Sequence, residues 1–125
     1  MKINVDNINN NVVSFSSEFG NGLGIWVGEY PHLNKEYHVE FEIRKTIKKN
    51  DVHLSESNTG SIEVVNDRNL LTMQLIDYEN TGCATFLLGD LIVDIETQYD
   101  LFFPSVKNKF LEICIDDLYI YAYEI

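Results

Sequence analysis

The stretch that decides the fold reads EYHVEFEI at residues 36–43. Charged or histidine side chains occupy its even-numbered positions, and apolar side chains occupy its odd-numbered positions. Successive side chains of a β-strand point to opposite faces, so this period of two predicts a strand with one face on a core and the other on solvent. Burial on one face only is typical of antiparallel sheets. The stretch therefore predicts an antiparallel β-protein.

The same alternation recurs at residues 91–96, 111–115 and 118–122, which we also expect to be strands. Alanine, the best helix former, occurs only at Ala84 and Ala122. Less regular runs are rich in β-branched and aromatic residues, and turn-forming Asn, Asp and Gly separate them. These runs are residues 12–16, 23–28, 61–65, 70–78 and 83–88. The chain thus predicts about eight short strands.

Three connecting segments carry expectations of their own. Residues 66–69, Asn-Asp-Arg-Asn, predict a hairpin. Residues 116–117, Asp-Asp, are consistent either with a tight hairpin or with a bend in one long strand. Residues 99–108 contain Pro104, so we expect at most a single helical turn there.

Five short segments stand out in chain order: GIWVG at 24–28, Pro31, YHVE at 37–40, LGDLIV at 88–93 and LYIY at 118–121. Their order resembles small barrels of the OB-fold type, in which about five strongly curved strands close on themselves. The resemblance implies a barrel over most of the chain. We therefore predict a single all-β domain over residues 1–125, an OB-like antiparallel Greek-key barrel, with a β-sandwich as the alternative.

The composition excludes several classes of function. Nine basic and twenty acidic residues give a formal net charge of −11, whereas nucleic-acid binders neutralise phosphates with Lys and Arg. No window approaches the roughly twenty apolar residues of a membrane span, and the first residues lack the apolar core of a secretion signal. We expect a cytoplasmic protein that binds neither membrane nor nucleic acid. Cys83 and Cys114 are expected to be reduced, with one disulfide between them as the alternative.

No motif for nucleophilic catalysis, phosphate binding or a cofactor occurs, so we predict neither an enzyme nor a cofactor. A small acidic single domain without catalytic motifs is similar in composition to bacterial immunity proteins. Those proteins present a carboxylate-rich surface to a basic toxin. The similarity implies a basic protein partner, which is a toxin if this chain is an immunity protein.

The last predicted strand offers a candidate surface for such a partner. Alternation places Leu118, Ile120 and Ala122 on one face and the tyrosines on the other. Tyrosine is enriched at protein interfaces because it combines rigid apolar area with a polar hydroxyl. The predicted surface consists of Tyr119, Tyr121, Tyr123, Asp116, Asp117 and Glu124. The alternative is that both faces are covered and the tyrosines belong to the core.

Two further sets of residues carry weaker hypotheses. A ligand site for a small molecule or a saccharide is expected either at the barrel mouth or in the region of Trp26 and Tyr30. His38, Glu40 and Glu42 share a strand face at a spacing that would allow a metal site. The polar outer face of an ordinary amphipathic strand explains the same pattern, so we predict no metal.

The expected function is thus that of a non-enzymatic acidic protein that binds a basic protein partner. A small-molecule or saccharide-binding barrel module is the alternative. A homodimer through an edge strand or through the tyrosines stays open, because unpaired sheet edges favour self-association.

Overall fold

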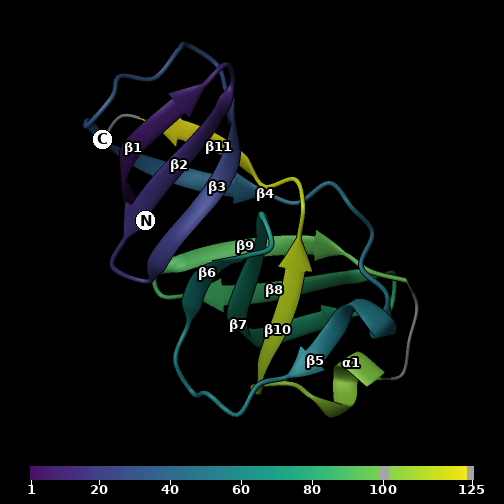
Figure 1. The fold of residues 1–125 in the computed structure, drawn as a ribbon. Helices are drawn as coiled ribbons and strands as arrows, with labels where there is room; N and C mark the ends of the chain where they lie inside the picture. Colours follow the sequence, from purple (N-terminus) through teal and green to yellow (C-terminus); the bar gives the residue numbers. More distant parts are fainter. Residues whose placement is uncertain (99–101, 124–125) are drawn as a thin grey trace.

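Strands account for 62% of the chain, which confirms the all-β class. The computed structural model describes residues 1–98 and 102–123, and within them eleven strands form two connected parts (Figure 1). Five strands make a barrel, and the other six pack outside it as a second part of the sheet, joined to the barrel by a parallel bridge between Gly20 and Ile62. The barrel strands are β1 (Lys2–Asn9), β2 (Val12–Ser17), β3 (Gly20–Val27), β4 (Glu36–Glu42) and β11 (Tyr119–Tyr123).

The barrel closes through one parallel pairing. β1, β2 and β3 form an antiparallel meander, and β4 lies antiparallel to β1. β11 fills the remaining gap, antiparallel to β4 but parallel to β3, with Tyr119 opposite Ile25. The prediction of a closed barrel is confirmed, but the prediction that it is wholly antiparallel is wrong. The reason is that β11 enters from the second sheet and runs in the same direction as β3.

The second sheet contains β5 (Val52–Leu54), β6 (Ser61–Val65), β7 (Arg68–Glu79), β8 (Cys83–Leu88), β9 (Leu91–Glu96) and β10 (Phe110–Ile115). Its centre is β7, whose first half pairs with β6 and whose second half pairs with β8, while β10 lies along its other edge. β9 pairs with β8, and β5 pairs with β10. A single barrel therefore does not account for the whole chain, and the described strands do not form a simple sandwich of two sheets.

Local details correct several expectations. The hairpin at residues 66–69 is tighter than predicted, because Val65 pairs with Arg68 across a two-residue turn in which Asn66 and Asp67 both have positive φ. Neither interpretation of residues 116–117 is right, since they connect β10 in the second sheet to β11 in the barrel. Two strands escaped prediction, β1 and β5.

Helical structure is limited to short turns among the described residues. A 3-10 turn, η1, covers Lys49–Asp51, and the helical turn α1 covers Phe102–Ser105 with Pro104 inside it. The single turn expected in this region is therefore present, although residues 99–101 lie outside the described part. No helix in the described chain is long and apolar enough to cross a membrane.

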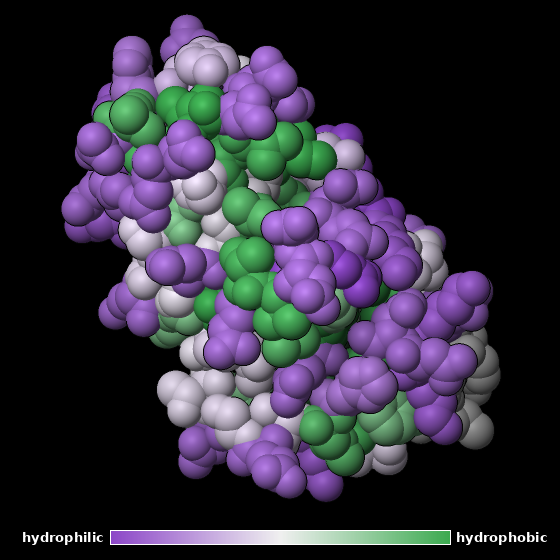
Figure 2. All heavy atoms as spheres, in the orientation of Figure 1, coloured by the Kyte–Doolittle hydropathy of each residue, from purple (hydrophilic) through white to green (hydrophobic). Residues whose placement is uncertain are grey.

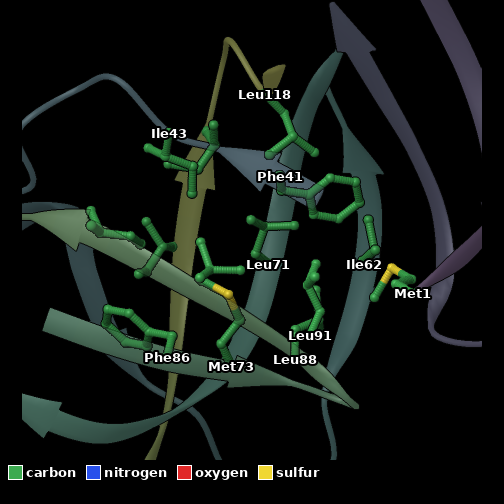
Figure 3. Packing of buried hydrophobic residues seen from close by; sticks show 14 of the residues in the cluster. Met1, Phe41, Ile43, Ile62, Leu71, Met73, Phe86, Leu88, Leu91 and Leu118 are labelled. Carbon is green, nitrogen blue, oxygen red and sulfur yellow. The ribbon is translucent and has the colours of Figure 1, made fainter. Parts of the chain in front are cut away.

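The barrel and the second sheet share one hydrophobic core (Figure 3). Phe41, at the end of β4, and Leu118, just before β11, come from the barrel side. They lie near Leu71 of β7, and Met73 of β7 and Phe86 of β8 belong to the same buried cluster. Burial of apolar area at about 25 cal/mol per Å² is the main force that holds the two parts together.

A buried asparagine adds a directional contact at the same junction. Asn69 of β7 is fully buried. Its side-chain oxygen accepts a hydrogen bond from the main-chain N–H of Leu23 in β3 at 2.8 Å, and its amide nitrogen donates to the carbonyl of Leu23 at 2.7 Å. The asparagine amide thus pairs with β3 as a neighbouring strand would, which fixes how β7 lies against the barrel.

Replacing Asn69 with leucine should destabilise the protein by about 2–6 kcal/mol, because two main-chain groups of Leu23 would lose their partners at about 1–3 kcal/mol each. Urea unfolding of Asn69→Leu followed by circular dichroism measures this loss. The matched control is Thr97→Val. The Thr97 hydroxyl is also buried but has no hydrogen-bond partner among the described residues, so its removal should leave stability unchanged or raise it. Equal losses for both variants would contradict the assigned role of Asn69.

Candidate functional site

The outer faces of β11 and β4 bring two predicted sets of residues together. In the antiparallel register of the two strands, Tyr119 lies opposite Glu42, Tyr121 opposite Glu40 and Tyr123 opposite His38. Directly opposite residues on one sheet face are close neighbours. The tyrosines predicted as a partner surface and the residues considered for a metal therefore form one surface, which we call the tyrosine–carboxylate surface: Tyr119, Tyr121, Tyr123, His38, Glu40 and Glu42.

The tyrosines of this surface point out of the barrel. Leu118 and Ile120 are fully buried on the inner side, whereas Tyr121 is half-buried and Tyr123 is 44% exposed. The alternation along β11 therefore assigned its faces correctly up to Ile120. Ala122 is exposed rather than part of the core, because it lies at the rim, where β11 reaches the barrel mouth.

Arg44 lies against this surface, and its contacts with the tyrosines were not predicted from the sequence. Its guanidinium group lies 3.6 Å from the ring centre of Tyr119, donates to the Tyr121 hydroxyl at 2.9 Å and pairs with Glu42 at 2.5 Å. The Tyr121 hydroxyl also donates to Glu42 at 3.1 Å. This arrangement holds both aromatic rings in place on the barrel exterior. The sequence shows Arg44 two positions after Glu42, but it does not show the contacts of Arg44 with Tyr119 and Tyr121, which lie more than seventy positions away.

These contacts shift the acid–base equilibria of the pair. The hydrogen bond from Arg44 lowers the pKa of Glu42 below its usual range, against a smaller effect of desolvation. The same hydrogen bond raises the pKa of Arg44. Both side chains are about half exposed, so solvent screens the pair: its contribution to stability is small, and its main role is to orient the two rings.

An acidic cleft lies next to the tyrosine–carboxylate surface, between the barrel and β9. Its volume is about 540 Å³. Asp94 of β9 accepts a hydrogen bond from Thr85 at 2.7 Å, and neither Asp94 nor Glu40 forms an ion pair with any described residue. The residues lining the cleft are Glu40, Phe41, Glu42, Ile92, Asp94 and Tyr121. Three carboxylates with only Arg44 beside them give the cleft a negative potential.

The predicted carboxylate rim is placed differently from the expectation. Asp116 forms an ion pair with Arg68 at the start of β7, so its charge is already compensated within the chain. Asp117 is exposed in the link between β10 and β11. Glu124 lies outside the described residues. The carboxylates that border Tyr121 are instead those of the cleft.

At its other end the surface reaches the barrel mouth. A pocket of about 710 Å³ there is lined by Trp26, Tyr30, Tyr37, His38 and Tyr123, among other residues. The Trp26 ring is almost buried and packs edge-on against Tyr37 at 4.8 Å, and its indole N–H donates to the Glu29 carbonyl. Tyr30 is 65% exposed. Trp26 and Tyr30 thus line one pocket, as the ligand hypothesis supposed.

The residues considered for metal binding are spread along the strand. His38 lies at the mouth beside Tyr123, with ring centres 6.1 Å apart, while Glu42 lies beside Arg44. Within residues 1–98 and 102–123, no group of three or more His, Cys, Asp or Glu side chains has the arrangement of a metal site. These residues form the polar outer face of an amphipathic strand.

The two cysteines lie on strands of the second sheet. Cys83 of β8 and Cys114 of β10 are both half-buried and are not bonded to each other. Burial raises the pKa of the Cys83 thiol, and the negative charge of Asp94 acts in the same direction. A raised pKa reduces the thiolate fraction, so Cys83 is a poor nucleophile.

Hydropathy on the molecular surface is unevenly distributed. In the orientation of Figure 1, hydrophobic side chains form a broken band across the junction of barrel and second sheet, and hydrophilic side chains border it on both sides (Figure 2).

Comparison with known proteins found no matching family model, no matching curated protein and no matching solved structure.

Replacing Arg44 with glutamine should raise the pKa of Glu42 towards its usual value, because the hydrogen bond that favours the carboxylate is lost. In the native protein the lowered pKa stabilises the fold above the pKa of an unfolded glutamate, and this stabilisation disappears as pH falls through the folded pKa. Arg44→Gln should therefore flatten the acid side of the stability profile. Carboxyl NMR titration checks the pKa directly. Lys45→Gln is the matched control, since Lys45 pairs with Asp51 and should leave Glu42 unaffected.

Proposed function

We propose that this protein is a non-enzymatic interaction protein that binds a basic protein partner through the tyrosine–carboxylate surface and the acidic cleft. One observation carries the proposal: outward-facing Tyr121 borders a cleft that holds Glu40, Glu42 and Asp94. Glu40 and Asp94 lack ion-pair partners among the described residues. Unpaired carboxylates beside rigid aromatic rings suit lysine or arginine side chains, which combine charge with an apolar stem.

The net charge of −11 supports the same proposal at longer range. A strongly acidic protein attracts a basic partner and speeds its association, while specificity comes from the local match of charges. Tyrosines near the centre of such a contact contribute most of the binding energy, because their rings bury large areas at low entropic cost. Because the Debye length is about 10 Å at 0.1 M salt, binding should weaken as salt rises.

The finer part of the proposal concerns the kind of partner and the kind of barrel. The compositional similarity to immunity proteins favours a basic toxin as the partner.

The ring of five strands with one parallel pair supports an OB-type barrel, into which the second sheet is inserted between β4 and β11. Fold type alone does not determine function, so the proposal depends on the surface and not on the barrel.

Reversing charge in the cleft should abolish partner binding. The tagged protein is used to capture proteins from nuclease-treated lysate of the source organism, with washes at low and high salt. We expect one stoichiometric basic protein that salt releases, and a loss of about tenfold or more for the double variant Glu40→Lys/Asp94→Lys.

The matched control is Glu56→Lys/Glu63→Lys, which changes the net charge equally on exposed residues outside the cleft and should retain the partner. Equal loss in both double variants would show that only overall charge matters. Recovery of no specific protein at either salt concentration would argue against the proposal itself.

The pocket at the barrel mouth favours a second candidate function, the binding of a small molecule or a saccharide. Aromatic rings from Trp26, Tyr30, Tyr37 and Tyr123 line it, and such rings stack on sugar faces and planar molecules. This candidate differs from the first because its binding would depend little on salt.

A ligand in the mouth pocket should raise the melting temperature in proportion to RT ln(1 + [L]/Kd). Thermal unfolding against a panel of mono- and oligosaccharides tests this, and Tyr30→Ala should remove the shift because the Tyr30 ring is exposed and free to stack. Tyr119→Ala is the control outside the pocket. A shift that persists in Tyr30→Ala but disappears with salt would place the ligand elsewhere.

A further inference from the structure

The edge of β9 that faces away from β8 carries unpaired main-chain groups. β8 and β9 form a hairpin with a two-residue turn at residues 89–90, and Leu88 lies opposite Leu91. In a hairpin with a two-residue turn, the two residues that flank the turn exchange main-chain hydrogen bonds. Along each strand, every second residue then turns its N–H and C=O groups away from the partner strand. Ile92 and Asp94 are the outward-turned residues. No described residue forms a main-chain hydrogen bond with them.

The end of the same edge confirms which residues turn outwards. Glu96, two positions beyond Asp94, directs its carbonyl away from β8 and accepts a hydrogen bond from the N–H of Ile47 at 2.9 Å. Ile47 in turn forms a parallel bridge with Thr97. The chain that leaves β4 thus covers the last part of the β9 edge with main-chain pairing. The part at Ile92 and Asp94 forms no main-chain hydrogen bond with a described residue and faces the end of β4 across the acidic cleft.

The open part of the edge borders the acidic cleft. Ile92 is 59% exposed, and it lines the cleft together with Asp94. Glu40 and Tyr121 form the opposite wall. A strand laid along this edge would therefore direct every second side chain towards carboxylates, with Ile92 offering an apolar contact.

We propose that the open edge of β9 at Ile92 and Asp94 takes up an extended segment of the basic partner as an added strand, with lysine or arginine side chains directed into the cleft. This inference deepens the proposed function and rests on it. Main-chain hydrogen bonds supply affinity in such strand addition, and alternate side chains supply specificity. The pairing of Ile47 limits the added strand to the part of the edge before Glu96.

A second copy of this chain is a poorer occupant of the edge. Self-pairing through β9 would bring the Asp94 and Glu96 side chains of two copies close together, and like charges on neighbouring strands destabilise a sheet. The net charge of −11 opposes the approach of two copies as well. Charge complementarity therefore selects a basic segment.

The test uses the intact protein and a ten-residue amidated peptide of alternating lysine and valine at low salt. Amide hydrogen exchange measured by NMR should slow by about tenfold or more at Ile92 and Asp94 when the peptide binds. The variant Ile92→Pro removes an outward N–H that β8 does not use, and proline is tolerated at such edge positions. It should weaken peptide binding by about tenfold, whereas Ile92→Thr, which keeps the N–H, should change it by less than about threefold.

Several results would overturn the inference. Peptide binding without protection of Ile92 and Asp94, or equal binding by folded Ile92→Pro, would mean that side-chain charges alone bind the peptide. The proposed function would survive that result, because Ile92→Pro changes no charge and the Glu40→Lys/Asp94→Lys variant tests the charges separately. Failure of the peptide to bind would overturn the edge proposal. Protection of both amides that rises with protein concentration would overturn it as well, because it would mean that a second copy of the chain occupies the edge.

Discussion

The hydrogen-bonded contact between Asn69 and the main chain of Leu23 is the constraint on which the arrangement of the two sheets depends. Hydrophobic burial is non-directional, so the relative position of the barrel and the second sheet depends on directional contacts: this one and the main-chain pairing of Gly20 in β3 with Ile62 in β6. A buried amide that must satisfy both main-chain groups of one residue allows a single placement. The walls of the acidic cleft come from different sheets, Glu40 from the barrel and Asp94 from β9. The geometry of the candidate site therefore follows from a residue outside it.

Sequence patterns predicted best the strands that have one buried face and one solvated face. β4, β9 and β11 alternate regularly, and the structure buries the apolar side of each. β1 was missed because Ile3 and Val5 alternate with Asn and Asp residues, which are poor strand formers and resemble a loop. β5 has only three residues and is held by its pairing with β10, so no local pattern could indicate it. Parallel closure of the barrel is a long-range property that periodicity does not encode.

The candidate site was predictable in its parts but not in its assembly. Alternation indicated that Tyr121 faces away from Ile120, and it placed Glu40 on the outer face of its own strand. Register between strands about eighty residues apart decides that the two become neighbours, and no feature of either segment specifies it. The contribution of Arg44 and the pairing of Asp116 with Arg68 depend on the same long-range register. Sequence patterns therefore identified faces, while tertiary pairing determined which faces meet.

The order of the strands along the chain has a consequence for how the protein is made. The second sheet, from β5 to β10, is encoded between β4 and β11, so the first four strands leave the ribosome long before the strand that completes their ring. At about 5–20 residues per second, the edges of β3 and β4 stay open for on the order of ten seconds in each new molecule. During that interval β4 exposes charged residues, which discourage pairing with other nascent chains. Leu118 and Ile120 arrive together with the tyrosines of β11, so the same strand completes the core and the surface proposed to bind a partner.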